Sequence, residues 1–249
     1  MEEHFFKFSN LSTFSELTHG ISNRSFGDMK FGTKPDADIL KNRETFLSKL
    51  NVNISDLIVP HLAHGTRIAV VDKSHKGQGA TSLKTAIAAT DGLVTKDKGV
   101  FLMVTAADCL PVFIYDPILK ISGVIHAGWR GIVGQIIPRA IEQFKIFGSD
   151  GKNLVVGIGP GICQKHFIVK KDVLSLFLDS YPSATLVRNK DGYVDLKKAV
   201  LIDLKNMGVS GDNIEIANVC TACDNGIYGS YRKEKELAPV AAAVIGIKE

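Results

Sequence analysis

The chain has 249 residues, of which 45% are hydrophobic, and this length supports one large core or two closely joined halves. Its 30 basic and 26 acidic residues leave a net charge of only +4, without a Lys/Arg block that would predict nucleic-acid binding. The longest apolar runs, such as Leu237–Ile247, fall short of the ~20 residues that a membrane span needs. We therefore expect neither a nucleic acid nor a membrane as a partner.

Cysteine usage predicts the compartment. The four cysteines, Cys109, Cys163, Cys220 and Cys223, are few for a chain of this length. The first 20 residues carry several charged side chains and lack the apolar core of a secretory signal. We therefore expect a cytoplasmic protein with free thiols.

The first half of the chain is predicted to contain a loop, a helix and short strands. Residues His19–Asp36 are rich in Gly, Ser, Asn and Asp, which is typical of a loop, whereas Ala37–Leu50 has apolar residues at near-helical spacing. Arg43 lies within this helix, where we interpret it as a surface or salt-bridge residue, with anion binding as the alternative. Three apolar runs then predict strands: Leu57–Val59, Arg67–Asp72 and Gly99–Thr105.

The second half alternates short strands with helices. Four apolar or β-branched runs predict further strands besides the last one at Val240–Ile247: Val112–Asp116, Ile121–Ile125, Leu154–Ile158 and Ile214–Val219. Helical periodicity covers Ile132–Phe147, Lys171–Ser180 and Asp195–Met207, and Pro138 implies a kink or a restart in the first of these. Because the elements show no regular βαβ rhythm, we expect an α+β architecture with mixed sheets and one compact domain over residues 1–249.

The stretch from Val104 to Gly131 brings two reactive side chains together. Cys109 precedes the first strand of a predicted antiparallel pair, and His126 follows the second. Such a pair places the start of one strand beside the end of the next, so we expect these residues to be close although 17 positions separate them. A thiolate beside an imidazole predicts either a metal site or a nucleophile with its base.

A third residue favours the metal site. His64, like Cys109 and His126, lies at the edge of a predicted strand, where a rigid scaffold can hold a ligand. Two imidazoles and one thiolate suit Zn²⁺, and three protein ligands leave a fourth position for water or substrate. In this interpretation Asp108 transfers a proton or orients the water, and Arg130 binds an anionic group.

Two other enzyme classes compete with this interpretation. A cysteine hydrolase would use Cys109 as nucleophile and His126 as base, but it has no role for His64, and chelation of metal would leave it active. A multicopper oxidase needs more histidines than the seven in this chain, none of which form an HxH pair. We therefore expect zinc rather than copper.

Cys220 and Cys223 form a CxxC motif, which can bind zinc or act in redox chemistry. A single CxxC supplies only two ligands, and no second CxxC or HxxxH follows it in the sequence. We therefore interpret these cysteines as two unconnected thiols.

Five motifs span nearly the whole chain: HGTRIAVV from His64, DGLVT at Asp91–Thr95, ADCLPV at Ala107–Val112, HAGWRG at His126–Gly131 and IGPGI at Ile158–Ile162. Together they resemble the YfiH-like family. Members of that family have been labelled polyphenol oxidases or laccase-domain proteins, and they are better described as zinc-dependent purine nucleoside phosphorylases with adenosine deaminase activity. The two motifs around Cys109 and His126, at this spacing, are highly specific.

The resemblance implies a fold, a site and a reaction. The fold is a layered α/β/β/α arrangement, and the zinc ligands are His64, Cys109 and His126. Phosphate would split inosine, adenosine and methylthioadenosine into a free base and a sugar 1-phosphate, and adenosine could also be deaminated to inosine. We expect a monomer or a small homo-oligomer.

Substrate and phosphate contacts are predicted for four residues, namely Arg43, Arg130, Tyr231 and Arg232. The last two belong to the Ser-Tyr-Arg motif of the family. Three places depart from the family pattern: Leu62, Met29–Gly32 and Leu237–Pro239. Because these departures affect substrate contacts rather than zinc ligands, a weakly active, nucleoside-binding member of the family is a second hypothesis.

Overall fold

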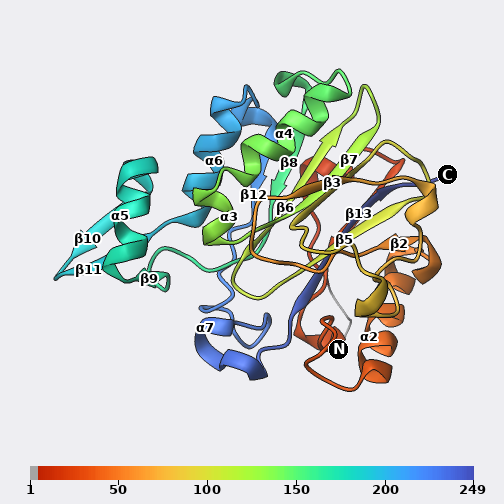
Figure 1. The fold of residues 1–249 in the computed structure, drawn as a ribbon, viewed down its shortest axis with the longest axis horizontal. Coiled ribbons are helices and arrows are strands. Elements are labelled where there is room, and N and C mark those ends of the chain that lie inside the picture. Colours follow the sequence, from red (N-terminus) through yellow and green to blue (C-terminus); the bar gives the residue numbers. More distant parts are fainter. Residues whose placement is uncertain (1–4) are drawn as a thin grey trace.

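Two mixed β-sheets form the centre of the molecule in the computed structural model, which describes residues 5–249 (Figure 1). The smaller of the two has four strands in the order β1 (Leu17–Ile21), β13 (Ala241–Ile247), β5 (Phe101–Ala106) and β2 (Leu57–Ile58). The larger has six, in the order β12 (Ile214–Ile216), β8 (Val155–Ile158), β6 (Leu110–Asp116), β7 (Ile121–Ala127), β4 (Gly92–Thr95) and β3 (Ile68–Val70). Each sheet contains both parallel and antiparallel pairs.

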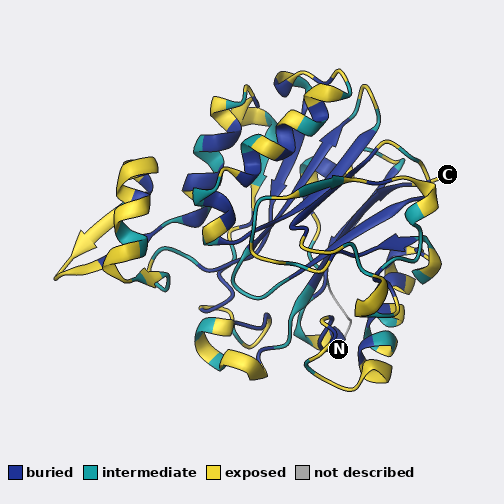
Figure 2. Ribbon diagram, viewed as in Figure 1, coloured by how far each residue is buried: buried dark blue, intermediate teal, exposed yellow. Residues whose placement is uncertain are grey.

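Three hydrophobic cores show how these sheets are layered. The core between the sheets joins Phe113 and Val124 of the six-stranded sheet to Val104 and Ile245 of the four-stranded sheet. Helix α2 (Asp36–Leu50) covers the outer face of the four-stranded sheet through a second core. The third core covers the outer face of the six-stranded sheet with three helices: α3 (Trp129–Val133), α4 (Ile136–Ile146) and α6 (Leu196–Asn206). The arrangement is therefore the expected α/β/β/α, with the central strands buried between the layers (Figure 2).

A small third sheet stands to one side of these layers (Figure 1). It contains β9 (Ile168–Val169), β11 (Asp191–Val194) and β10 (Thr185–Arg188), with helix α5 (Lys171–Ser180) packed against it. Only α5 was predicted, because β10 is mostly exposed and its sequence shows no buried face. The single-turn helix α1 (Ser9–Ser12) packs on β1, β8 and β12 and adds Leu11 to the core between the sheets, whereas the short helix α7 (Tyr231–Glu234) lies beside the layers (Figure 1).

The hairpin of β6 and β7 sets the position of the predicted site. In its antiparallel register, Pro111 lies opposite His126, as the sequence predicted for the neighbourhood of Cys109. The buried carboxylate of Asp116 fixes the turn at the other end by accepting hydrogen bonds from the backbone N–H groups of Ile118 (2.8 Å) and Leu119 (2.9 Å).

One prediction about the elements needs correction, and the structure decides between the two alternatives of another. The expected loop His19–Asp36 begins inside β1, where His19 is buried and accepts a hydrogen bond from the backbone N–H of Phe8 at 3.0 Å. Of the two alternatives predicted at Pro138, a kink or a restart, the structure has the restart, since α4 begins two residues earlier, after Gln135 in a left-handed conformation. No helix within residues 5–249 is long and apolar enough to cross a membrane.

Candidate metal centre

The three predicted ligands converge in the structure. His64 comes from the loop before β3, Cys109 from the turn between β5 and β6, and His126 from the end of β7. Their ligand atoms all lie within 4.8 Å of one another. The two imidazole rings are nearly perpendicular, at 88°, with centroids 4.9 Å apart. Side chains far apart in the sequence thus form one group that can hold a single ion.

Gly128 keeps the space beside these ligands open. A Cβ atom at this position would lie 3.1 Å from the Cys109 Sγ, 3.5 Å from the His64 Cδ2 and 3.6 Å from the His126 Cε1. The Gly128 Cα therefore faces all three side chains, and any larger residue would crowd them. The glycine of the HAGWRG motif has a steric role at the candidate centre.

Asp91 holds both histidines and is the main residue that sequence reasoning missed. Its fully buried carboxylate accepts hydrogen bonds from the backbone N–H groups of Ala63 (3.2 Å), His64 (2.9 Å) and Gly65 (2.8 Å). The Nδ1 of His126 donates a fourth, at 3.0 Å, and the backbone carbonyl of Asp91 accepts one from the His126 N–H at 2.7 Å. The sequence indicated only a turn at Asp91, because its partners are distant in the chain.

The bond to Asp91 decides which nitrogen of His126 can bind a metal. A carboxylate only accepts hydrogen bonds, so the proton of a neutral His126 lies on Nδ1 and Nε2 is left as the ligand atom. Burial acts against ionisation of Asp91, but His126 and the N–H groups around Gly65 outweigh it and lower the pKa of this carboxyl. A charged carboxylate behind a histidine ligand is the usual support of a metal site.

The electrostatics of Cys109 also suit a metal. Burial disfavours its thiolate, but His126 and His64 outweigh this effect and lower the pKa of the thiol to about 6. Burial likewise opposes the charged form of His126, whereas the Cys109 thiolate and Asp91 raise the pKa of this imidazole to about 9. A thiolate among imidazoles can bind Zn²⁺ or serve as a nucleophile, so both sequence-based interpretations have the required geometry.

Two residues at the candidate centre have a strained backbone. His64 has a φ of 54° and Asp108 a φ of 78°, values that non-glycine residues rarely adopt. The Asp108 carboxylate accepts hydrogen bonds from the Thr221 hydroxyl and the backbone N–H of Arg232, both at 2.6 Å. These bonds hold the strained turn that presents Cys109.

A family model described as multi-copper polyphenol oxidoreductase laccase matches residues 12–248. The chain belongs to this family. It is 30% identical over 247 residues to the purine nucleoside phosphorylase YlmD of Bacillus subtilis, covering 96% of this chain and 89% of that protein. It is 31% identical over 200 residues to the adenosine deaminase RL5 of an unknown prokaryotic organism, covering 78% of this chain and 76% of that protein.

The fold comparison agrees with the sequence comparison. The crystal structure of the hypothetical protein YfiH of Bacillus licheniformis matches with a TM-score of 0.89 at 26% identity, covering 93% of each chain. The predicted resemblance to the YfiH-like family and the mixed α+β fold are both confirmed. The description of the family names a laccase, whereas its member YlmD is named a phosphorylase, and these two names imply different chemistry. The residues of the site are therefore needed to choose between the two activities.

Arg130, the arginine of the HAGWRG motif, was predicted to bind substrate, and its guanidinium is free to bind an anion. It lies in the first turn of α3, exposed, with its guanidinium carbon 4.3 Å from the centre of the Trp129 ring. Among residues 5–249 its guanidinium has no hydrogen-bond or ion-pair partner. Its position four residues after the ligand His126 places this cation on the chain segment that leaves the candidate centre.

The Ser-Tyr-Arg motif of the family lies on α7. The guanidinium of Arg232 donates hydrogen bonds to the backbone carbonyls of His166 (2.7 Å) and Ile168 (3.2 Å), while its backbone N–H binds Asp108. The hydroxyl of Tyr231, a half-exposed residue, donates to Glu236 at 3.0 Å. Arg232 therefore ties α7 to the turn of Cys109 and to the start of the small sheet.

Arg43 is not a surface residue, and this prediction is wrong. Its side chain is only 3% exposed, and its guanidinium donates to the backbone carbonyls of Met29, Gly79 and Ala80 at 2.7–3.0 Å. It also stacks on Phe31, with 4.2 Å between the guanidinium carbon and the ring centre. With these donors occupied, Arg43 joins two buried loops, and we leave it out of the proposed binding site.

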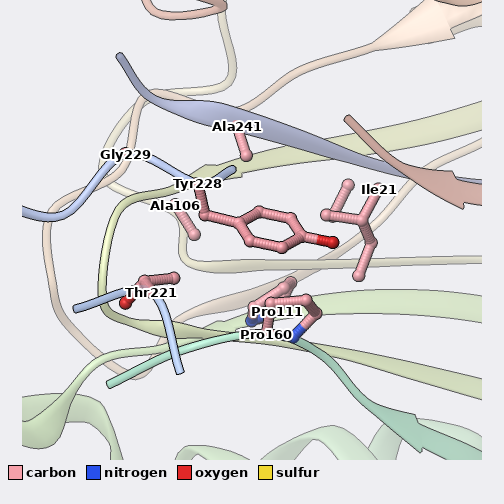
Figure 3. A pocket seen from close by; sticks show the side chains of 9 residues that line it. Ile21, Ala106, Pro111, Pro160, Thr221, Tyr228, Gly229 and Ala241 are labelled. Carbon is pink, nitrogen blue, oxygen red and sulfur yellow. The ribbon is translucent and has the colours of Figure 1, made fainter. Parts of the chain in front are cut away.

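Figure 3 shows a small cavity between several segments of the chain. Ala106 and Pro111, which flank the turn of Cys109 in the sequence, line the cavity together with Ile21, Thr221 and Tyr228. The ring of Tyr228 extends across it, and the lining is mostly apolar. We regard this cavity as a packing gap, because none of the three candidate ligands lines it. The candidate centre opens to the surface at the exposed His64 instead.

The interpretation of Cys220 and Cys223 as unconnected thiols is also wrong. The structure places both beside Cys163 and His166, and the four ligand atoms lie within 4.8 Å of one another. The partner motif is a C-x-x-H at residues 163–166, which precedes the CxxC in the chain. The prediction failed because it took into account only the residues after Cys223.

Proposed function

We propose that this chain is a zinc-dependent purine nucleoside phosphorylase that also deaminates adenosine. Its substrates would be inosine, adenosine and methylthioadenosine, with phosphate as the second substrate of the cleavage reaction. The observation that carries this proposal is the convergence of His64, Cys109 and His126 on one point beside Gly128. The phosphorylase and deaminase names of the relatives support the choice of substrates.

The ligand set favours zinc over a multicopper centre. Two imidazoles and a thiolate supply three ligands and leave a fourth position for a reactant, which is the pattern of catalytic zinc. A trinuclear copper cluster needs many more histidines, and His64 and His126 are the only pair that meets in a candidate metal group within residues 5–249. We therefore propose Zn²⁺ as the cofactor, despite the copper in the description of the family.

Each residue of the site has a distinct role in this proposal. His64, Cys109 and His126 would hold the zinc ion, which supplies a Lewis acid when bound. Asp91 keeps the proton of His126 on Nδ1 and fixes the His64 loop. The predicted proton transfer by Asp108 stays a prediction, since both of its oxygens already accept hydrogen bonds that fix the Cys109 turn.

Phosphate would bind to Arg130, the exposed cation just after the site in the chain. Cleavage of a nucleoside develops positive charge on the sugar, which a bound phosphate dianion stabilises before it captures the sugar. The guanidinium of Arg130 offers a pair of parallel N–H donors that matches two phosphate oxygens. The exposed ring of Tyr231 is the proposed contact for the nucleoside.

A metal assay beside a nucleoside assay tests the proposal. We expect zinc in protein purified without added metal, free base from inosine only when phosphate is present, and ammonia from adenosine. His64→Ala should lose both zinc at this centre and turnover. The matched control is His61→Ala, since His61 is exposed, lies three residues away and is outside the ligand group. Equal losses in the two variants would contradict the role of His64.

Two alternatives give different results in the same assays. A cysteine hydrolase built on Cys109 and His126 would keep its activity after zinc is removed by a chelator. A weakly active, nucleoside-binding member would bind adenosine and inosine without turnover. Arg130→Ala should raise the KM for phosphate at least about tenfold while the zinc content stays the same. Loss of zinc in this variant would instead make Arg130 a structural residue.

The setting of the enzyme is also a proposal. We propose that it works in the cytoplasm, because its four cysteines are free thiols in two groups, which suits a reducing compartment.

A further inference from the structure

A second group of metal-binding side chains lies outside the proposed catalytic centre. The Nδ1 of His166 faces three sulfur atoms, at 3.4 Å from Cys163, 3.7 Å from Cys220 and 3.4 Å from Cys223. All four cysteines of the chain are free, so no disulfide holds this group together.

These distances match the edges of a zinc tetrahedron. Zinc binds cysteine sulfur at about 2.3 Å and histidine nitrogen at about 2.0–2.1 Å, so at the tetrahedral angle the sulfur and the nitrogen are about 3.6 Å apart. The three measured separations lie on both sides of this value. One imidazole nitrogen at nearly equal distance from three sulfurs is what a common central ion requires.

The backbone around Cys220 is arranged for a thiolate. Its Sγ accepts hydrogen bonds from the backbone N–H groups of Cys163 (3.2 Å) and Cys223 (3.4 Å). The donors are themselves residues of this group. The segment of Cys163 and the segment of Cys223 each direct one backbone N–H toward the Cys220 Sγ. Such bonds stabilise the ionised sulfur that a metal needs.

We propose that Cys163, His166, Cys220 and Cys223 bind one structural Zn²⁺ ion. Four protein ligands fill a tetrahedral site and leave no position for a substrate, which distinguishes this site from the three-ligand centre. The spacing also fits, because a C-x-x-H on one segment and a C-x-x-C on another each supply two ligands from a single turn. The proposal stands on this geometry and does not depend on the proposed enzymatic activity.

The ion would join two segments that support the catalytic turn. One carries Cys163 and His166 from β8 to β9 of the small sheet, and the other follows β12 and leads to α7. Thr221, inside the CxxC, donates to the Asp108 carboxylate at 2.6 Å. Arg232 binds the His166 carbonyl with its guanidinium and Asp108 with its backbone. Zinc at this site would therefore fix both partners of Asp108.

Counting zinc in a set of variants tests the proposal. We expect two zinc ions per chain in the full-length protein, one in Cys109→Ala, one in Cys223→Ser and none when both changes are combined. Cys223 is the exposed member of the group, so its replacement disturbs the core least. His75→Ala removes a histidine that belongs to neither group and should keep both ions.

The outcomes separate this site from the catalytic one. The unmodified protein and Cys109→Ala could each contain one zinc ion, with none in Cys223→Ser. This result would support the structural site and contradict the proposed zinc enzyme. A zinc-free Cys109→Ala protein, or a Cys223→Ser protein that keeps two ions, would overturn the structural site.

If the Cys223→Ser protein does not fold, a measurement on Cys109→Ala alone still tests the proposal. Replacing its zinc by Co²⁺ should give an intense thiolate-to-cobalt absorption with tetrahedral visible bands. Because Cys109 is absent from this variant, the thiolates must come from Cys163, Cys220 and Cys223. Weak absorption of an octahedral, oxygen-bound cobalt would overturn the proposal.

Discussion

Replacing Asp91 by Asn tests the inference that one carboxylate positions both histidine ligands. The two side chains have the same shape, so the change leaves no cavity. The carboxylate accepts four hydrogen bonds, two on each oxygen: from His64 and His126 on Oδ1, and from Ala63 and Gly65 on Oδ2. Whichever way the amide is turned, its NH₂ group faces two N–H donors.

The magnitude follows from the donors that lose their partner. A fully buried N–H left without an acceptor costs about 1–3 kcal/mol, and the backbone N–H groups of residues 63–65 are only partly buried, so two lost partners predict a loss of roughly 1–3 kcal/mol in the free energy of unfolding. Loss of a carboxylate that orients a metal ligand should also weaken zinc binding at the proposed centre by about 10–100-fold. Urea unfolding of the metal-free protein measures the first effect, and competition with a zinc chelator measures the second.

Asp116→Asn is the matched control. Asp116 is equally buried, but one oxygen accepts both of its hydrogen bonds and the other has no partner in the described structure. An asparagine at this position keeps both bonds with its carbonyl oxygen, so the stability loss should be clearly smaller and the zinc affinity unchanged. Equal effects of the two substitutions, or an unchanged zinc affinity in Asp91→Asn, would refute the reasoning.

Four further predictions concern the same centre and its surroundings. Gly128→Ala adds a methyl group 3.1 Å from the Cys109 Sγ at an extended backbone position that alanine tolerates, so zinc affinity should fall by roughly tenfold or more with little change in the melting temperature. Arg43→Ala leaves buried carbonyls without donors; it should lower the free energy of unfolding by about 3 kcal/mol and leave the KM for phosphate unchanged, whereas a raised KM would restore its predicted binding role. In metal-free protein, iodoacetamide should alkylate Cys109 with a half-maximal rate near pH 6, and zinc should protect it; a midpoint at the ordinary thiol pKa of about 8.5 would contradict the pairing with the histidines. The pKa of Asp91 is lowered in the folded state, so the contribution of Asp91 to stability should be complete above the ordinary carboxyl pKa of about 4 and disappear as the pH falls further. Urea unfolding midpoints measured across this pH range should show the dependence in the unmodified protein and not in Asp91→Asn.

The sequence predicted the proposed zinc ligands because local patterns determine their positions. Two apolar runs on either side of Pro117 predict the hairpin, and its antiparallel register then brings Cys109 near His126. His64 could be added because it lies at the edge of a predicted strand and completes a chemically sensible ligand set. These inferences needed only strand direction and ligand chemistry.

The missed features all depend on contacts between distant segments. Asp91 looked like an ordinary turn residue, and only the fold brings the His64 loop onto its carboxylate. Arg43 occupies a helical position that was interpreted as surface, yet two loops close over it. Cys163 lies 57 residues before Cys220, and only the fold shows that its C-x-x-H motif meets the CxxC.

The turn held by Asp116 has a consequence for the whole β6–β7 hairpin. Side chains alternate between the faces of a strand, so pairing displaced by one residue would turn the ligand of β7 to the opposite face. The buried carboxylate at the closed end of the hairpin therefore selects the pairing that presents His126 to Cys109 at its open end. Errors in turn formation during folding would yield a protein with intact strands that cannot assemble the proposed cation site.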